Sequence, residues 1–382
     1  MTEWKKVKLG DYCEITSSKR IFLSEYTDTG ILFCRSKEII EMSENNEISE
    51  PLYISETKYK EIKERFGVPQ VGDLLLTSVG TIGVPYVVKD NDCFYFKDGN
   101  LTWFRHFKQN VDSTFVYYWI KSSEGYGVLN NTTIGSSQKA LTISALKRLE
   151  IPCPPIAIQH SIATTLSRYD ALIANYHRQI KLLEEAAQRL YKEWFVDLHF
   201  PGHENVKVID GVPEGWEKKA ITDLLEIKYG KDHKPLKEGT YPVYGTGGVM
   251  RYVEKTLYTG ESVLIPRKGS LNNIMLVNDS FWTIDTMFYS IPKIKDTAKI
   301  AYFYLKGLDM YNLNNGAAVP SMTVQILSTL KLILPSDDIR SVFEQKVSVM
   351  YNDIRTLQHS ISLLTESRDR LLPKLMSGEI EI

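Results

Sequence analysis

Apolar residues recur in alternating steps of three and four along two long stretches of this chain. The first stretch carries Leu166, Ile173, Ile180, Leu183 and Leu190, and the second carries Val347, Ile354, Ile361, Leu364 and Leu371. A period of about 3.5 residues that persists over several heptads is typical of a coiled-coil seam. The pattern therefore predicts two long helices that pair along these positions.

The two stretches are copies of one unit. Residues 151–195 align with residues 332–376 at an offset of 181, which places Pro154 on Pro335 and Arg189 on Arg370. The prolines mark where each helix begins, because a proline ring is tolerated at a helix start and not in its interior. Each helix of about 40 residues spans roughly 60 Å at about 1.5 Å per residue.

The segments between the helices favour strands. Short runs rich in β-branched and aromatic residues are bounded by Gly, Asp or Asn, as expected for strands of a mixed sheet; they are Asp73–Thr77, Tyr86–Lys89, Val263–Pro266, Ile274–Val277 and Met287–Ile291. Helices are predicted at equivalent points of the two units, over Ser113–Ser122 and Ile300–Met310.

The unit starts also match, at a different offset. Trp4 aligns with Trp216, and Gly10–Ile15 with Thr222–Ile227, 212 residues apart. The offset falls to 188 between Gly72 and Gly260 and to 181 at Thr142, so the first unit carries 31 extra residues, mostly before Gly72. We expect the Glu-rich stretch 38–64 to hold most of this insertion, as a solvated face or an edge helix.

These patterns predict an α+β protein with an internal pseudo-two-fold repeat. Two β-rich mixed globular units are joined by two long antiparallel coiled-coil helices. The expected boundaries are 1–153 for the first unit, 154–198 for the first helix, 199–335 for the second unit and 336–382 for the second helix.

Composition narrows the class of protein. The chain is 43% hydrophobic and 24% charged, has no long uncharged apolar window and starts without a signal-peptide pattern, so we expect a cytoplasmic protein that does not enter a membrane. The four cysteines form no CxxC pair and predict neither a disulfide framework nor a zinc site. A net charge of −1 argues against nonspecific nucleic-acid binding by bulk charge, but it leaves room for local basic patches.

No catalytic constellation emerges. The chain lacks a P-loop. The segment Pro152–Ile156 lacks the polar residue and the aromatic residue of an amino-methyltransferase tetrapeptide, and it reads as the turn into the first helix. We therefore expect a chain without its own active site or metal.

At this point the chain resembles the specificity (S) subunit of type I restriction-modification systems, over essentially its whole length. The resemblance rests on the paired unit starts, on GDLLLTSVGTIG and GESVLIPRKGSL, on YPVYGTGG and WTIDTMFY, and above all on the order head, helix, head, helix. Gln159 fits the family's glutamine after the proline turn, whereas Arg340 occupies that place in the second copy and departs from it.

The resemblance implies that each unit is a target recognition domain that reads one half of a bipartite, asymmetric site in double-stranded DNA. It implies that the helices set the gap between the halves and that two methyltransferase subunits dock on the chain. Restriction and translocation subunits join that complex. S-adenosylmethionine, ATP and magnesium are then expected on the partner subunits and none in this chain, which would serve an adenine-N6 methyltransferase and ATP-dependent endonuclease.

The chemistry of the side chains predicts which residues contact DNA, because cationic and small polar side chains at turns reach phosphates and base edges. In the first unit they are Arg35, Lys37, Ser78, Thr81, Gln138 and Lys139, and in the second they are Lys231, Lys234, Tyr244, Arg267 and Lys268. Two alternatives stay open: the same architecture serving a type IIB-like or other DNA-modification complex, and a coiled-coil adaptor that binds only proteins.

Overall fold

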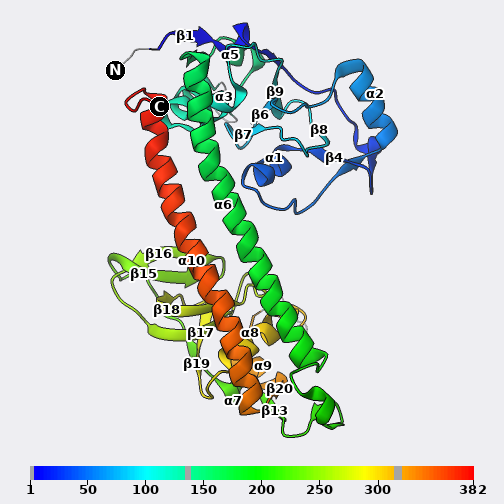
Figure 1. The fold of residues 1–382 in the computed structure, drawn as a ribbon, viewed down its shortest axis with the longest axis vertical. Helices are drawn as coiled ribbons and strands as arrows, with labels where there is room; N and C mark the ends of the chain where they lie inside the picture. The colour runs from blue at the N-terminus through cyan, green and yellow to red at the C-terminus, as the bar shows by residue number, and fades with distance from the viewer. Residues whose placement is uncertain (1–3, 134–138, 314–320) are drawn as a thin grey trace. The chain divides into compact units, whose positions relative to one another are not determined.

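The computed structural model describes residues 4–133, 139–313 and 321–382, and it divides into two units. Unit 1 comprises Met1–His177 with Gln358–Ile382, and unit 2 comprises Arg178–Leu357. Each unit thus contains a globular head and part of each long helix, α6 (Ile156–Tyr191) and α10 (Asp337–Met376) (Figure 1). No helix in the described part of the chain has the length and apolarity needed to cross a membrane.

The head of unit 1 is β-rich with helices between the strands. Its elements are β1 (Lys6–Lys8), β2 (Glu14–Thr16), β3 (Tyr26–Thr27), β4 (Ile31–Cys34), α1 (Ser36–Ser43), β5 (Tyr53–Ile54), α2 (Glu56–Phe66), β6 (Leu74–Thr77), β7 (Pro85–Val87), β8 (Phe94–Phe96), β9 (Leu101–Arg105), α3 (Ser113–Lys121), α4 (Ser123–Thr132), α5 (Ile143–Lys147) and β10 (Glu150–Pro152). The strands form sheets of order β2-β9-β6-β7 and β3-β5-β4-β8, and β1 pairs with β10.

The head of unit 2 repeats this plan. Its elements are β11 (Val208–Ile209), β12 (Val212–Pro213), β13 (Glu217–Ala220), α7 (Ile221–Leu224), β14 (Leu225–Tyr229), β15 (Glu238–Gly245), β16 (Gly248–Val253), β17 (Tyr258–Pro266), β18 (Met275–Thr283), β19 (Met287–Pro292), α8 (Ala298–Lys306), α9 (Val324–Thr329) and β20 (Lys331–Leu334). The main sheet has the order β14-β19-β17-β18-β15-β16, and β13 pairs with β20. The predicted strands and helices of both heads are present, although the helix predicted over Ile300–Met310 ends at Lys306.

Strand pairing makes the repeat explicit. The order β2-β9-β6-β7 corresponds to β14-β19-β17-β18. The parallel pair β4–β8 corresponds to the parallel pair β15–β18, with Phe33 opposite Tyr95 in one and Tyr244 opposite Thr283 in the other. The insertion in unit 1 falls between β4 and β6 and consists of α1, β5 and α2, where unit 2 has only the β15–β16 turn and β16.

The two copies also share their caps. Thr142 begins α5 and accepts a hydrogen bond from the amide of Ala145 at 3.2 Å, and Thr323 begins α9 and accepts one from Ile326 at 3.1 Å. A threonine at this position satisfies an amide that has no partner within the helix. Their match at an offset of 181 therefore has a local structural cause.

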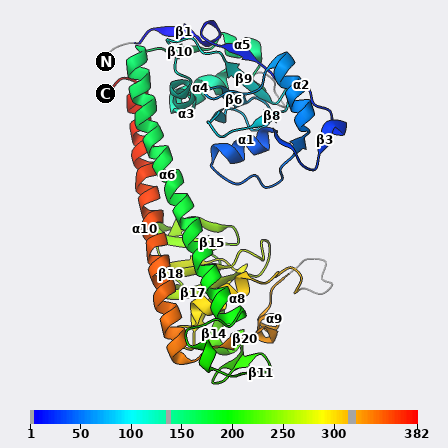
Figure 2. The same cartoon turned by 45° about the vertical axis from the view of Figure 1, so that its right-hand side comes forward.

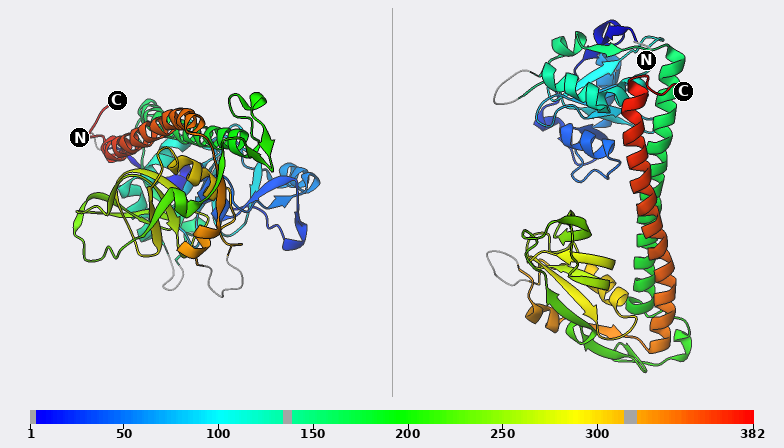
Figure 3. Two further views of the ribbon diagram at one scale, coloured as in Figure 1. Left: turned by 90° about the horizontal axis from the view of Figure 1, so that it is seen from below. Right: turned by 90° about the vertical axis from the view of Figure 1, so that its left-hand side faces the viewer.

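Each head packs on both long helices. In unit 1 the start of α6 and the end of α10 enter one core, where Ile162 and Leu166 join Leu372 and Leu375. In unit 2 the end of α6 and the start of α10 do so, where Ala187 and Tyr191 join Phe343 and Val347. The helices are therefore antiparallel, as predicted, and Figures 2 and 3 show them paired within each unit.

The predicted seam is most buried where a head covers it. Leu166, Val347 and Ile354 are buried, and the remaining seam positions are partly exposed; they are Ile173, Ile180, Leu183, Leu190, Ile361, Leu364 and Leu371. A polar cluster replaces the seam at Arg368, whose guanidinium donates to Asp170 at 2.6 Å, while Tyr118 from α3 donates to the other oxygen of Asp170 at 2.7 Å. This cluster links α3, α6 and α10 in unit 1.

Candidate nucleic-acid interface

In unit 2 the predicted contact loops meet at one edge of the main sheet. The loop after β14 is held by Lys231, whose amide donates to the carbonyl of Thr283 at 2.9 Å. The turn after β17 is held by Arg267, whose amide donates to the carbonyl of Thr286 at 2.8 Å. The β15–β16 turn joins them, because Asn273 donates to the carbonyl of Thr246 at 2.8 Å. Loops from separate strands thus form one continuous surface.

Arg267 is fixed in place by its neighbours. Its guanidinium carbon lies 4.7 Å from the ring centre of Tyr229 and 5.1 Å from that of Phe288. One of its nitrogens donates to the carbonyl of Asp285 at 2.7 Å. A guanidinium stacked on aromatic rings keeps its charge and loses little further freedom on binding.

The lysines at this edge can bind an anion. Lys231, Lys234 and Lys268 are exposed, and none of them forms an ion pair with another residue of the described chain. Tyr244 behaves differently, because its ring packs on Phe281 with centroids 6.0 Å apart, and burial raises the pKa of its hydroxyl. The edge of unit 2 is therefore cationic, with Tyr244 as part of its support.

The corresponding edge of unit 1 is assembled in the same way. The amide of Ser78 donates to the carbonyl of Asn100 at 2.8 Å, and the amide of Leu141 donates to the carbonyl of Ser78 at 2.9 Å. The amide of Gly99 donates to the hydroxyl of Ser17 at 3.4 Å. The loops after β2, after β6 and before β9 therefore meet there, next to Lys139.

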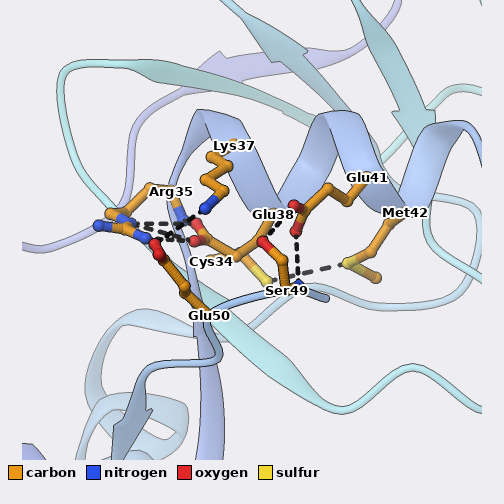
Figure 4. A network of polar contacts seen from close by, with 8 residues as sticks. All are labelled: Cys34, Arg35, Lys37, Glu38, Glu41, Met42, Ser49 and Glu50. Carbon is orange, nitrogen blue, oxygen red and sulfur yellow. Dashed lines mark hydrogen bonds and ion pairs between the residues drawn. The ribbon is translucent and has the colours of Figure 1, made fainter. Parts of the chain in front are cut away.

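Arg35 and Lys37 begin α1 and are engaged with carboxylates of their own unit (Figure 4). Arg35 pairs with Glu38 at 2.5 Å, and Lys37 pairs with Glu50 at 2.8 Å. Burial alone would raise the pKa of Glu38, but its hydrogen bonds from Arg35 outweigh that effect and lower it. The stretch 38–64 is thus not simply a solvated face, since Glu38 is fully buried.

The other predicted residues of unit 1 differ in accessibility. Ser78 is buried, and its hydroxyl lies 2.7 Å from that of Thr102, so its hydrogen-bonding capacity is used inside the sheet. Thr81 and Lys139 are exposed. Lys139 lines a hollow of about 380 Å³, and Thr81 lies between two of the other residues that line it. The lining residues are Gly80, Ile82, Gly83, Tyr126, Leu129, Asn130 and Lys139. Gln138 lies outside the described residues.

The structure adds three cations that were not predicted. Lys19 and Arg20 follow β2, and Lys97 follows β8, so all three lie at this edge. Arg20 pairs with Asp98 at 3.0 Å, whereas Lys19 and Lys97 form no ion pair within the described residues. A signal for Lys19 was present in the sequence, because the offset of 212 between the unit starts places it on Lys231.

Neither edge resembles a metal or cofactor site. No group of three or more His, Cys, Asp or Glu side chains is gathered for a metal anywhere in residues 4–133, 139–313 and 321–382. What the edges offer is exposed ammonium groups on loops held by backbone hydrogen bonds, which suit the phosphates and groove edges of a nucleic acid.

Comparison with known proteins agrees with this chemistry. The family model for the type I restriction modification DNA specificity domain matches residues 1–185 and 213–359, and so covers both repeats. The type I restriction enzyme MjaIX specificity subunit of Methanocaldococcus jannaschii is 27% identical over 353 residues, covering 81% of this chain and 78% of that protein. The HindI specificity subunit of Haemophilus influenzae is 22% identical over an alignment of 480 residues that spans 100% of both chains.

The fold is shared with a solved structure as well. The crystal structure of a type I restriction-modification S subunit from M. genitalium aligns over 97% of this chain and 96% of that chain, with a TM-score of 0.65 and 19% identity. With one head plan built twice, a cationic loop edge on each head and a family match across both repeats, this chain belongs to the DNA specificity subunits of type I restriction-modification systems, the noncatalytic subunits that recognise DNA.

Proposed function

We propose that the two heads, residues 1–153 and 199–335, each read one half of a bipartite, asymmetric site in double-stranded DNA. The loop edges described above are the reading surfaces. In unit 2 the contacts fall to Lys231, Lys234, Arg267 and Lys268, and in unit 1 to Thr81 and Lys139, joined by Arg35 and Lys37 once they exchange their carboxylate partners. Ser78 and Tyr244 support these loops from within.

One observation carries this proposal. The heads share a sheet plan, yet the loops at the equivalent edge differ: unit 1 has the start of α1 where unit 2 has the β15–β16 turn. Sequence is read by side chains that reach base edges, so two different loop sets on one frame suit two different half-sites. A site with unlike halves is asymmetric.

We propose further that the helical segments 154–198 and 336–382 set the gap between the half-sites and dock two methyltransferase subunits. Apolar side chains on the outer faces of these helices support docking, among them Leu172, Leu182, Val342, Val349 and Leu363, all exposed. S-adenosylmethionine, ATP and magnesium then act on the methyltransferase and the restriction and translocation subunits, where adenine N6 is methylated and DNA is cut.

The test is to express the chain with the methyltransferase subunit encoded beside it and to map N6-methyladenine by single-molecule sequencing. We expect one bipartite motif with a methylated adenine in each half. The double variant K231A/K268A is expected to lose methylation, whereas Lys207→Ala, an exposed lysine of unit 2 on another loop, should leave the motif methylated. A stable complex that methylates a contiguous motif, or none, would overturn the proposal.

A further inference from the structure

The two heads can be compared with each other position by position, because strands of their sheets pair in the same register. Thr16 lies opposite Trp103 in the β2–β9 pair, and Lys228 lies opposite Tyr289 in the β14–β19 pair. Offsets of 212 and 186 relate these residues, and the neighbouring pairs follow the same offsets. Equivalent positions on these strands, and on the residues that directly follow β2 and β14, can therefore be named.

Lys19 and Lys231 occupy one such position. Each lies three residues beyond the matched strand residue, Thr16 or Lys228, and each is exposed. The amide of Lys19 donates to the hydroxyl of Tyr95 at 2.7 Å, and the amide of Lys231 donates to the carbonyl of Thr283 at 2.9 Å.

Both anchors lie on a strand that takes part in a parallel pair. Tyr95 lies on β8, which pairs with β4, and Thr283 lies at the end of β18, which pairs with β15. The acceptor is a side-chain hydroxyl in unit 1 and a backbone carbonyl in unit 2, and in each head it holds the backbone of the lysine next to the sheet.

The surroundings of the two lysines are different. Arg20 follows Lys19, and Asp232 follows Lys231. The ammonium of Lys19 lies 4.7 Å from the ring centre of Phe66, on the insertion that unit 2 lacks. Neither lysine has a carboxylate partner within the described residues. What recurs is therefore an uncompensated ammonium at a fixed place, and not the loop around it.

A residue that is the same in both heads cannot tell two unlike half-sites apart, whereas backbone phosphates are alike in both. We infer that Lys19 and Lys231 each bind a DNA backbone phosphate at equivalent points of the two half-sites and position the heads on the duplex. Base reading falls to the segments that differ, such as Arg267–Lys268 in unit 2. This inference rests on the proposed function and assigns Lys19 a role that pairs it with Lys231.

The experiment measures the affinity of the assembled methyltransferase complex for its own site and for an unrelated duplex over a range of NaCl concentrations. Lys19→Gln and Lys231→Gln keep much of the aliphatic stem and remove the charge. Each is expected to weaken binding to both duplexes by the same factor and to make the slope of log K against log salt shallower by about 0.9, the value for one phosphate contact. Lys19→Arg and Lys231→Arg should restore affinity, and the methylated motif should stay unchanged in all four.

Matched controls come from a second recurring pair. Lys6 and Lys218 are also equivalent and exposed, but they lie on β1 and β13, which pair with β10 and β20 and not with the sheet that carries the edge. Their Gln variants should leave the salt slope unchanged. An unaltered slope in K19Q and K231Q, or an altered motif, overturns the inference while the proposed function stands. A wild-type complex with no preference for a bipartite site overturns both.

Discussion

Gln159 and Arg340 show that different side chains can do one task. Gln159 is fully buried and donates to the carbonyl of Pro154 at 2.8 Å, and Arg340 donates to the carbonyl of Pro335 at 2.8 Å. Each side chain thus ties the start of its helix to the proline turn that precedes the helix. The departure from glutamine in the second copy changes the residue and keeps the contact.

Replacing Gln159 by Ala should destabilise the protein substantially. The amide oxygen of Gln159 accepts from the backbone of Asp112 at 2.9 Å, and its nitrogen also donates to the carbonyl of Asn110 at 3.1 Å. Because buried polar groups left without partners cost about 1–3 kcal/mol each, we expect a loss of about 2–4 kcal/mol in the free energy of unfolding. Urea denaturation followed by circular dichroism measures it.

Gln345→Ala is the matched control, since Gln345 is an exposed glutamine near the start of the other helix. It should change stability by less than about 0.5 kcal/mol. Equal effects of the two substitutions would mean that the buried amide contributes nothing specific.

A buried ammonium organises the core of unit 2. Lys299 on α8 is 4% exposed and donates to both Glu261 on β17 and Glu344 on α10. Burial raises the pKa of Glu261, and Lys299 opposes that effect only in part. The three side chains therefore connect the head of unit 2 to α10, although burying the Lys299 charge costs free energy.

Lys299→Met should cost about 3 kcal/mol at neutral pH, the lower end of the range for a fully buried pair, because it leaves two partly buried carboxylates without a counter-charge. An acid whose pKa is higher folded than unfolded binds protons more readily in the folded state, so its contribution to stability grows as pH falls. Without Lys299 the pKa of Glu261 rises further. The deficit of the variant relative to wild type should therefore shrink between about pH 8 and about pH 5. Unfolding curves at both pH values decide this, and a deficit that is constant or grows on acidification contradicts it.

At single residues, sequence reasoning identified which types of side chain suit DNA and not which of them are available. Ser78 has a hydroxyl that could reach DNA, but it directly follows β6, is buried, and its hydroxyl lies against that of Thr102. Arg35 was chosen for its charge, which a carboxylate three residues later neutralises. Local spacing does not reveal burial or pairing, because both depend on neighbours brought in by the fold.

At the level of elements, the pattern was more informative. The heptads predicted α6 and α10, because a helix buries one face along its length only if apolar residues recur at the heptad spacing. The short β-branched runs predicted β6, β17 and β19. The change in offset placed most of the insertion before Gly72, and the Glu-rich composition pointed to residues 38–64, which lie between β4 and β6 in the structure. Helices α1 and α2 agree with the expectation of a helix in this stretch, whereas β5 was not predicted, because it depends on pairing with β3 and β4.

The α3–α4 junction gives a matched pair of substitutions in one helix. A Cβ added at Gly125 would lie 1.9 Å from the carbonyl oxygen of Trp119, whereas a Cβ added at Gly127 meets no described atom within 4 Å. Gly125→Ala should therefore destabilise the protein by about 1–3 kcal/mol through forced backbone movement. Gly127→Ala should stabilise it by about 0.5–1 kcal/mol, because alanine favours the helix. Thermal unfolding measures the stability of both variants. If Gly125→Ala were the more stable variant, the backbone at the α3–α4 junction would be able to move at little cost.

On the scale of the whole molecule, the proposed function assigns the paired helices the task of setting the gap between the half-sites. A heptad added to both helices at equivalent positions, after Gln179 and after Ser360, preserves the seam. Seven residues add roughly 10 Å of helix, which corresponds to about three base pairs at roughly 3.4 Å per pair. We expect the gap in the methylated motif to lengthen by about that amount while both halves stay the same.

Methylation mapping of the lengthened chain reads the gap directly. A heptad added to α6 alone should abolish the motif, because each head packs on both helices and cannot keep both contacts when only one helix is longer. An unchanged gap in the doubly lengthened chain would falsify the idea that the helices set it.

The short strand pairs at the base of each head affect how the sequence of such a chain can evolve. In unit 1 the incoming strand β1 pairs with the outgoing strand β10, and in unit 2 β13 pairs with β20. The backbone therefore enters and leaves each head on two adjacent, paired strands. A head bounded in this way is a cassette: recombination between two genes can exchange it whole without disturbing the helices. If each head reads one half-site as proposed, one crossover event on each side changes half of the recognised sequence and leaves the other half intact.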